Sequence, residues 1–154
     1  MKISYLADYP EFIEIMAPWI YEHWRACLID ETLDARIEKL RSHLNKDTLP
    51  IAFVAHAGTE VFGTAALRVH DLPGRDDLTP WLGGVFVAEP FRNRGIGTKL
   101  CAAVEEKAKF LFGQHPLYLF TLDKQSWYQN QGWSFYDSCA WCGSEGDIMV
   151  KQIV

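Results

Sequence analysis

The sequence has little cysteine, no excess of positive charge and no long hydrophobic run, and each absence excludes a class of protein. Its 154 residues include only 4 cysteines, too few for a small domain held together by a framework of disulfides. The 15 basic and 20 acidic residues give a formal net charge of −5 at pH 7, so a nucleic-acid surface built on basic excess is not expected. No apolar run reaches the roughly 18 residues that a membrane-spanning helix needs.

The four cysteines and the N-terminus indicate a reduced, cytoplasmic compartment. Residues 1–5 lead directly into acidic residues and contain no apolar signal-peptide core. Cys139 and Cys142 have C-x-x-C spacing, but no second Cys or His pair lies nearby to complete a zinc site, so two ordinary thiols are expected. Cys27 and Cys101 fall on predicted helix faces, where we expect small core residues.

Glycine and proline are present at ordinary levels, with 11 and 7 residues, which excludes collagen-like and linker-rich chains. Hydrophobic residues make up 49% and aromatic residues 14%, which excludes a disordered polyelectrolyte. We find no repeat, low-complexity tract or linker, so residues 1–154 are interpreted as a single domain. The aromatic content is also compatible with a homodimer.

Hydrophobic spacing predicts an α/β order of elements along the chain. Strands are expected over residues 3–6, 51–56, 61–69, 81–87, 117–122, 133–136 and 148–153. Helices are expected over residues 9–27, 32–44, 95–112 and 124–131. Asp8 and Asp30 are the expected N-caps of the first two helices, and Pro18 should kink or divide the first one.

The clearest chemical signal lies in the segment Val-Phe-Val-Ala-Glu-Pro-Phe-Arg-Asn-Arg-Gly-Ile-Gly-Thr-Lys-Leu, residues 85–100. It contains an apolar strand, a short turn with Gly95 and Gly97, and the start of a helix. Unpaired N–H groups at a helix start attract anions, and glycines let a phosphate approach the main chain. Arg92 and Arg94 add cationic donors beside this turn. These residues predict a pyrophosphate site.

The spacing Arg-x-x-Gly-x-Gly after a strand resembles the acetyl-CoA motif of the GNAT acyltransferases, and the order of elements is similar over nearly the whole chain. The resemblance implies an α/β (α+β) fold with a mixed, mostly antiparallel central sheet of about seven strands flanked by about four helices. It implies acetyl-CoA as co-substrate and no metal. By position, main-chain groups of Phe86 and Val87 bind the pantetheine arm, and the N–H near Val87 polarises the thioester carbonyl. The pyrophosphate is held by the backbone N–H groups of Arg92, Asn93, Arg94, Gly95, Ile96, Gly97 and Thr98.

Other phosphate-binding motifs fit this segment less well. A Rossmann fingerprint needs a third glycine where the sequence has Leu100, and the Walker A pattern is absent. A glycine-rich turn that binds no ligand is the remaining alternative, but it does not explain the flanking arginines.

Residues 119–133 resemble the family's strand followed by a helix that ends in aromatic-Tyr-x-x-x-Gly-aromatic. By position, Tyr128 is implied to protonate the departing CoA thiolate. A phenol with a pKa of about 10 can donate to a thiolate whose thiol has a pKa of about 8–9. The alternative is that Tyr128 only packs between helix and sheet. Many relatives carry an asparagine at the start of this helix, where this chain has Thr-Leu-Asp at residues 121–123, so the resemblance does not establish the pantetheine side-chain contact.

A general base is needed because the attacking amine is mostly ammonium at neutral pH. Asp71 is the preferred candidate, since it follows a strand end beside the expected cleft. His70, Asp76, Asp77 and Glu89 are the alternatives, and transfer through water would relax the geometry required of any of them.

The sequence therefore predicts an acyl-CoA-dependent N-acetyltransferase that moves an acetyl group to a primary amine by direct attack. The acceptor is a small molecule or a peptide, which suits the acidic composition, and neither nucleic acid nor membrane is expected as a partner. A CoA-binding sensor without turnover and a nucleotide-phosphate binder are the competing interpretations.

Overall fold

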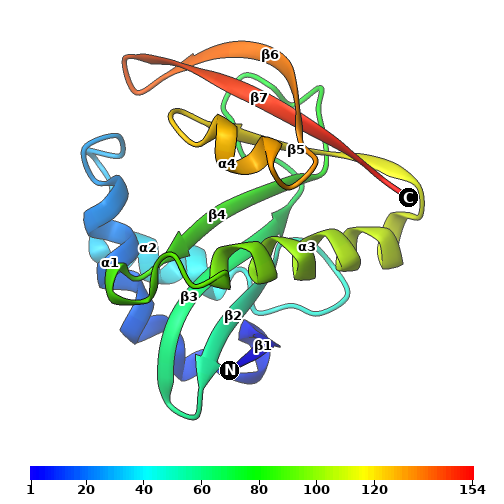
Figure 1. Cartoon of the computed structure of the whole chain (residues 1–154). Coiled ribbons are helices and arrows are strands. Elements are labelled where there is room, and N and C mark those ends of the chain that lie inside the picture. Colours follow the sequence, from blue (N-terminus) through cyan, green and yellow to red (C-terminus); the bar gives the residue numbers. More distant parts are fainter.

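The computed structural model describes residues 1–154 and contains a seven-stranded sheet with helices on both faces (Figure 1). The strands are β1 (Lys2–Tyr5), β2 (Ile51–Ala57), β3 (Glu60–Arg68), β4 (Trp81–Val87), β5 (His115–Thr121), β6 (Ser134–Trp141) and β7 (Ser144–Ile153). The α-helices are α1 (Ile13–Trp24), α2 (Leu33–Arg41), α3 (Ile96–Phe112) and α4 (Gln125–Gln129). Short 3₁₀ turns span Leu6–Asp8, Pro10–Phe12 and Glu89–Phe91. The predicted fold class is confirmed.

The strand order explains where the sheet opens. The strands follow the order β1-β2-β3-β4-β5-β7-β6, and β4–β5 is the single parallel pair among antiparallel neighbours. β4 and β5 are paired at one position, Trp81 opposite Tyr118. Beyond that position the two strands diverge, as Figure 1 shows, and their facing backbone edges are left without ladder partners.

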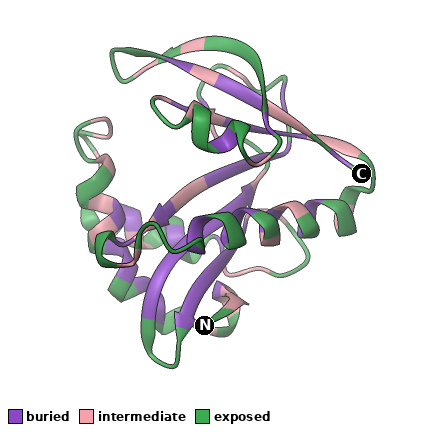
Figure 2. Cartoon of the chain, in the orientation of Figure 1, coloured by how far each residue is buried: buried purple, intermediate pink, exposed green.

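Two packed layers hold the sheet. Along β2, Ile51, Phe53 and Ala55 join the core beneath α3, whereas Ala52 and Val54 join the core beneath α1 and α2. This alternation follows from the pleat of a strand, and both faces are covered, so the strand is apolar at successive positions. Figure 2 shows the buried residues concentrated along the central strands and on the inner sides of the helices. No helix is long and apolar enough to span a membrane.

Two predicted N-caps are wrong, and Pro18 does not divide the first helix. Pro18 lies inside α1, and the helix continues through it. Proline has no N–H, so the Glu14 carbonyl loses its helical hydrogen-bond partner. Both residues are exposed, so water can hydrogen-bond to this carbonyl. Asp8 does not cap this helix but forms an ion pair with Lys46. The N-cap of α2 is Thr32 rather than Asp30, with the Thr32 hydroxyl accepting a hydrogen bond from the Ala35 N–H at 3.0 Å.

The cysteines also differ from expectation. Cys27, in the turn after α1, and Cys142, in the turn between β6 and β7, form a disulfide across 115 residues of sequence, with their Cα atoms 5.1 Å apart. Neither is therefore an ordinary thiol or a small core residue, and spacing along the chain could not reveal a pair so far apart. Cys101 is buried as predicted, and Cys139 is free. Disulfides are uncommon in reduced compartments, so this pair does not support the expectation of one.

Candidate functional site

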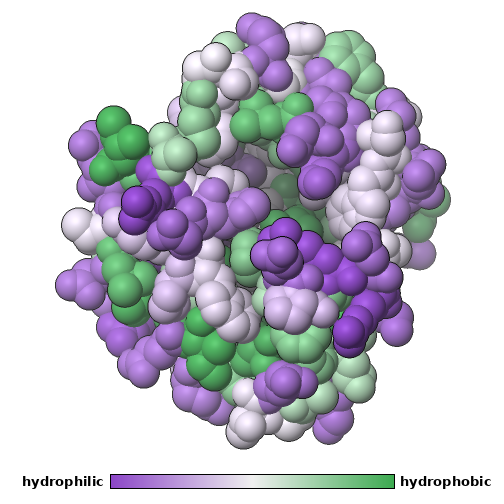
Figure 3. Space-filling view, turned by 60° about the vertical axis from the view of Figure 1, so that its left-hand side comes forward, coloured by the Kyte–Doolittle hydropathy of each residue, from purple (hydrophilic) through white to green (hydrophobic).

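A β-bulge shapes the edge of the opening between β4 and β5. Thr64 of β3 faces Phe86 and Ala66 faces Gly83, so two residues of β4, Gly84 and Val85, stand opposite one residue of β3. Gly84 has a φ of +60°, which favours glycine. Such a bulge bends a strand and re-aims its backbone groups. Figure 3, which brings the left-hand side of Figure 1 forward, shows a hollow near the centre of this face.

The loop between β4 and α3 has the geometry of an anion site. Asn93 and Gly95 have φ values of 64° and 79°, so the chain passes twice through the left-handed region before α3 begins at Ile96. Left-handed residues in a turn gather successive N–H groups into a concavity, and the first N–H groups of a helix have no partner within it. Residues 92–95 are exposed, and no acidic residue lies in the first turn of α3. The loop therefore fits a diphosphate.

Gly97 is in close contact with a neighbouring aromatic side chain. A Cβ atom there would lie 3.0 Å from the ring of Trp127, which α4 places against the start of α3. The missing side chain thus makes room for Trp127. This contact ties the loop to the helix that carries Tyr128.

Arg92 lies along the end of β4. Its Nε donates a hydrogen bond to the Val87 carbonyl oxygen at 2.8 Å, and its guanidinium stands 5.7 Å from the centre of the Phe86 ring. Arg94 lies in the same way over Phe91, at 5.8 Å. Arg92 therefore spans from the loop to the two residues of β4 that were predicted to contact pantetheine.

Tyr128 is 8% exposed in the core under α3, with Trp127 and Trp133 packed around its ring. Burial raises the pKa of its hydroxyl, and the nearby Cys101 and Asp71 add to the shift. The hydroxyl is consequently neutral in the physiological range and can only donate or accept hydrogen bonds. Both hypotheses for Tyr128, a packing residue and a hydrogen-bond donor, are compatible with this placement.

Asp71 lies directly beside the bulge. Its Oδ1 accepts a hydrogen bond from Arg68 Nη1 at 2.7 Å, and the two side chains are 19% and 14% exposed. A Cβ at Gly83 would come within 2.4 Å of Asp71 Oδ1, and one at Gly84 within 2.8 Å of Arg68 Nη2. The ion pair therefore rests on the glycine backbone of β4.

The alternative bases lie at the surface. His70 and Asp76 are exposed and stand 3.8 Å apart, and Asp77 pairs with Arg75. Glu89 is exposed in the 3₁₀ turn after β4. Asp71 is thus the candidate that the fold brings to the opening.

The end of α1 forms the other side of the opening. Trp19, His23 and Trp24 surround the Phe86 ring, with centroid distances of 6.4, 5.3 and 6.2 Å. Burial and then Arg92 lower the pKa of His23, while Asp123 in the β5–α4 turn raises it. These charge effects show that the end of α1 stands near both the glycine loop and the β5–α4 turn.

Sequence reasoning missed Arg68 and His43, which stands behind Arg68. The available signal was the pair Gly83 and Gly84 inside a buried strand, because glycine within a strand often marks a close approach by another group. Nothing local identified which side chains would approach.

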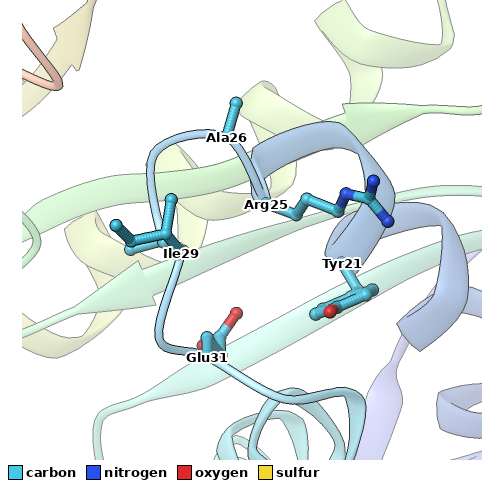
Figure 4. Close-up of a pocket in the computed structure, with 6 residues that line it drawn as sticks. Tyr21, Arg25, Ala26, Ile29 and Glu31 are labelled. Atoms are coloured by element: carbon cyan, nitrogen blue, oxygen red, sulfur yellow. The ribbon is translucent and has the colours of Figure 1, made fainter.

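Two other concave regions lie outside this opening. Figure 4 shows a pocket of about 390 Å³ at the bend between α1 and α2, with Tyr21, Arg25 and Glu31 around it. A second, of about 620 Å³, lies between β1 and α3. Neither is lined by a residue of the glycine loop or of α4. The structure contains no group of three or more His, Cys, Asp or Glu side chains that could hold a metal ion.

Comparisons with known proteins agree with the fold and with the family resemblance seen in the sequence. The model of the Acetyltransferase (GNAT) family matches residues 10–140. A crystal structure of aminoglycoside 6'-N-acetyltransferase complexed with coenzyme A has a TM-score of 0.77 and 19% identity, covering 100% of this chain and 98% of that chain. The aminoglycoside 6'-N-acetyltransferase from Enterococcus faecium has a TM-score of 0.76 at 19% identity over 100% and 98%. A GNAT-family acetyltransferase from Streptococcus pneumoniae has a TM-score of 0.72 at 16% identity over 99% of both chains. No curated protein matches.

Proposed function

The chain belongs to the GNAT acetyltransferase family, and from that premise we propose that it transfers an acetyl group from acetyl-CoA to a primary amine. The observation that carries this proposal is one continuous run of backbone. The unpaired edge of β4 leads directly into the concave loop at the start of α3. A thioester arm lying along β4 would therefore have its diphosphate at the helix N-terminus.

Main-chain groups are the proposed CoA ligands. Residues 93–98 supply N–H groups for the pyrophosphate, with Arg92 and Arg94 as cationic side-chain donors. The prediction for the Arg92 N–H is corrected, because this group already donates to the Glu89 carbonyl at 3.2 Å. Along β4 the free amide is that of Val87, because Phe86 pairs with Thr64 of β3 and its backbone groups face that strand. Acetyl-CoA brings the activated acyl group. The Val87 N–H is assigned to polarise its carbonyl, because the next residue, Ala88, donates its N–H to Phe62 of β3, so the alternating Val87 N–H faces the unpaired edge of β4.

Asp71 and Tyr128 are proposed to handle the protons. Asp71 attracts the acceptor ammonium and takes one proton, directly or through water, so that the neutral amine forms the new N–C bond as the C–S bond breaks. The acylated nitrogen then loses its second proton through water, and the departing CoA sulfur takes up a proton to leave as the thiol. Tyr128 donates a hydrogen bond to the leaving sulfur. Its raised pKa makes complete proton transfer to a thiolate unfavourable, so stabilisation of the developing negative charge is the role that suits it.

The acceptor class that we propose is a small polycationic amine. The chain has a net charge of −5, and aromatic rings at the end of α1 pack around Phe86 of β4. Aromatic faces and carboxylates both attract ammonium groups. The aminoglycoside acetyltransferases among the similar structures support this class over a protein lysine.

Acetyl-CoA turnover with a panel of amines tests the proposal. Thiol release should be measured with an aminoglycoside, a polyamine, an amino-acid amide and a lysine peptide. Tyr128→Phe should lower kcat by about tenfold or more, since a hydrogen bond to a charged group is worth about 1.5–3 kcal/mol. Tyr118→Phe is the matched control, because Tyr118 is 9% exposed and burial also raises its pKa, yet it faces Trp81.

Three results would contradict the proposal in different ways. CoA binding without turnover of any amine would favour the sensor interpretation. Tighter binding of ATP or NAD than of CoA would favour a nucleotide-phosphate binder. Equal effects of Tyr128→Phe and Tyr118→Phe on kcat would remove the hydrogen-bond role of Tyr128.

A further inference from the structure

A chain of three polar side chains runs from the end of α2 to the opening. His43 is 2% exposed and follows α2, while Arg68 is the last residue of β3. Arg68 Nε donates a hydrogen bond to His43 Nε2 at 2.9 Å, and Arg68 Nη1 donates to Asp71 Oδ1 at 2.7 Å. The guanidinium therefore joins a buried imidazole to the carboxylate beside the bulge.

The hydrogen bonds of His43 determine its tautomer. Its Nδ1 lies 2.7 Å from the carbonyl oxygen of Lys39, which can only accept, so Nδ1 carries the proton. Nε2 is then unprotonated and accepts from Arg68. Burial, together with the charges of Arg68, Lys39 and Arg36, lowers the pKa of His43 to about 4, which keeps the ring neutral. A protonated His43 would present a donor to Arg68 and break this contact.

The backbone of β4 completes the support for Asp71. Because Gly83 and Gly84 have no Cβ, the Arg68–Asp71 pair lies against the strand at its bulge. The hydrogen bonds of the carboxylate involve Oδ1, held by Arg68, and leave Oδ2 without an intramolecular partner. Oδ2 is thus available to an acceptor ammonium.

We propose that His43 is a positioning residue for acetyl transfer: through Arg68 it holds the Asp71 carboxylate at the β4 bulge, in reach of the acceptor amine. This inference rests on the proposed function, in which Asp71 takes the amine proton. His43 itself touches neither substrate. Its contribution is the single tautomer whose Nε2 accepts from Arg68.

Two substitutions of His43 separate positioning from general stability. In His43→Gln, the amide reaches the place of Nε2 and its oxygen accepts from Arg68. In His43→Asn, the shorter amide reaches the place of Nδ1 and keeps only the Lys39 contact. We expect His43→Asn to lower kcat/KM for the amine at least tenfold, and His43→Gln to restore most of it. The KM for acetyl-CoA should be unchanged in both, and thermal melting should show both variants folded.

A double-variant cycle gives a readout that a purely structural role would not move. Adding His43→Asn to Asp71→Asn should cause no further loss, since both substitutions act through one group. Equal losses in His43→Asn and His43→Gln, or additive losses in the double variant, would overturn the inference.

The tautomer can be measured without turnover. Long-range ¹⁵N–¹H correlation spectra of the imidazole should show His43 protonated at Nδ1 and neutral near neutral pH. An Nε2-protonated or cationic His43 would overturn the positioning role, whatever the activity. If instead the tautomer is as expected and Asp71→Asn leaves kcat/KM for the amine unchanged, the base assignment in the proposed function is the part that fails.

Discussion

Removal of the Cys27–Cys142 disulfide should destabilise the protein substantially. The cross-link joins residues 115 apart, and closing a loop of that length lowers the entropy of the unfolded chain by the equivalent of about 5 kcal/mol. Because removed disulfides commonly cost about 2–5 kcal/mol, we expect a loss in that range for Cys27→Ser combined with Cys142→Ser. For 154 residues, an unfolding entropy of about 2.1 cal/mol/K per residue converts this into a fall in Tm of about 6–15 °C.

Thiol titration and thermal melting test this prediction together. Denatured protein without reductant should show only the thiols of Cys101 and Cys139, and all 4 cysteines should react after reduction. Dithiothreitol should lower the Tm of the parent to that of the double variant and leave the double variant unchanged. Cys139→Ser is the control, because it removes a free thiol and should shift the Tm by no more than about 2 °C.

The reasoning is refuted if air-oxidised protein shows four reactive thiols, or if the double variant melts with the parent. The disulfide also joins the α1–α2 turn to the β6–β7 turn. A change in KM for the amine on reduction, with KM for acetyl-CoA unchanged, would show that these turns border the acceptor end of the opening.

Further predictions concern binding, geometry and pH. Arg92→Ala removes the guanidinium that lies between the loop and the Val87 carbonyl, so the Kd for CoA, measured by calorimetry, should rise about tenfold or more; an unchanged Kd would contradict the anion site. Gly83→Ala places a Cβ within 2.4 Å of Asp71 Oδ1, so kcat/KM for the amine should fall while CoA binding persists, and an active variant would argue against the placement of this carboxylate. The folded-state pKa of His43 is lowered from 6.5 to about 4, so the unfolded chain binds the extra proton between these values. The contribution of neutral His43 to the free energy of unfolding is therefore fully present above pH 6.5, and this free energy should fall by about 3 kcal/mol as the pH decreases to 4. Denaturant titrations should show this pH dependence in the parent and not in His43→Gln.

The fold could be predicted largely because its signals are local. Alternation and helical spacing reflect burial, so β2, β3, β4 and α3 were found close to their true bounds. β6 and β7 are longer than predicted. β6 is an edge strand, and most of its residues, including Phe135 and Tyr136, are exposed, so burial imposes no alternating pattern on it.

The CoA side of the candidate site was also local. Residues 85–98 are contiguous, and their arginines and glycines predict a helix N-terminus that can bind an anion. The contact of Gly97 with Trp127 was not predicted, because Trp127 approaches it from a different element. The pairing of Arg68 with His43 spans 25 residues, and that of Cys27 with Cys142 spans 115. Side chains that come into contact only in the folded sheet have no characteristic spacing in the sequence, so these contacts could not be predicted.

Local sequence patterns therefore predict the CoA side of the proposed site, whereas the acceptor side depends on contacts between residues far apart in the sequence. The proposed CoA contacts lie on one stretch of backbone, where a change of side chain alters little except at Arg92, Arg94, the left-handed Gly95 and Gly97, which packs against Trp127. The acceptor side is assembled from side chains of α1, the end of α2 and the end of β3. Side chains on those elements can change without disturbing the CoA loop. Acceptor specificity can therefore diverge among proteins that keep the same CoA motif, and the motif that reveals the acyl donor carries no information about the amine.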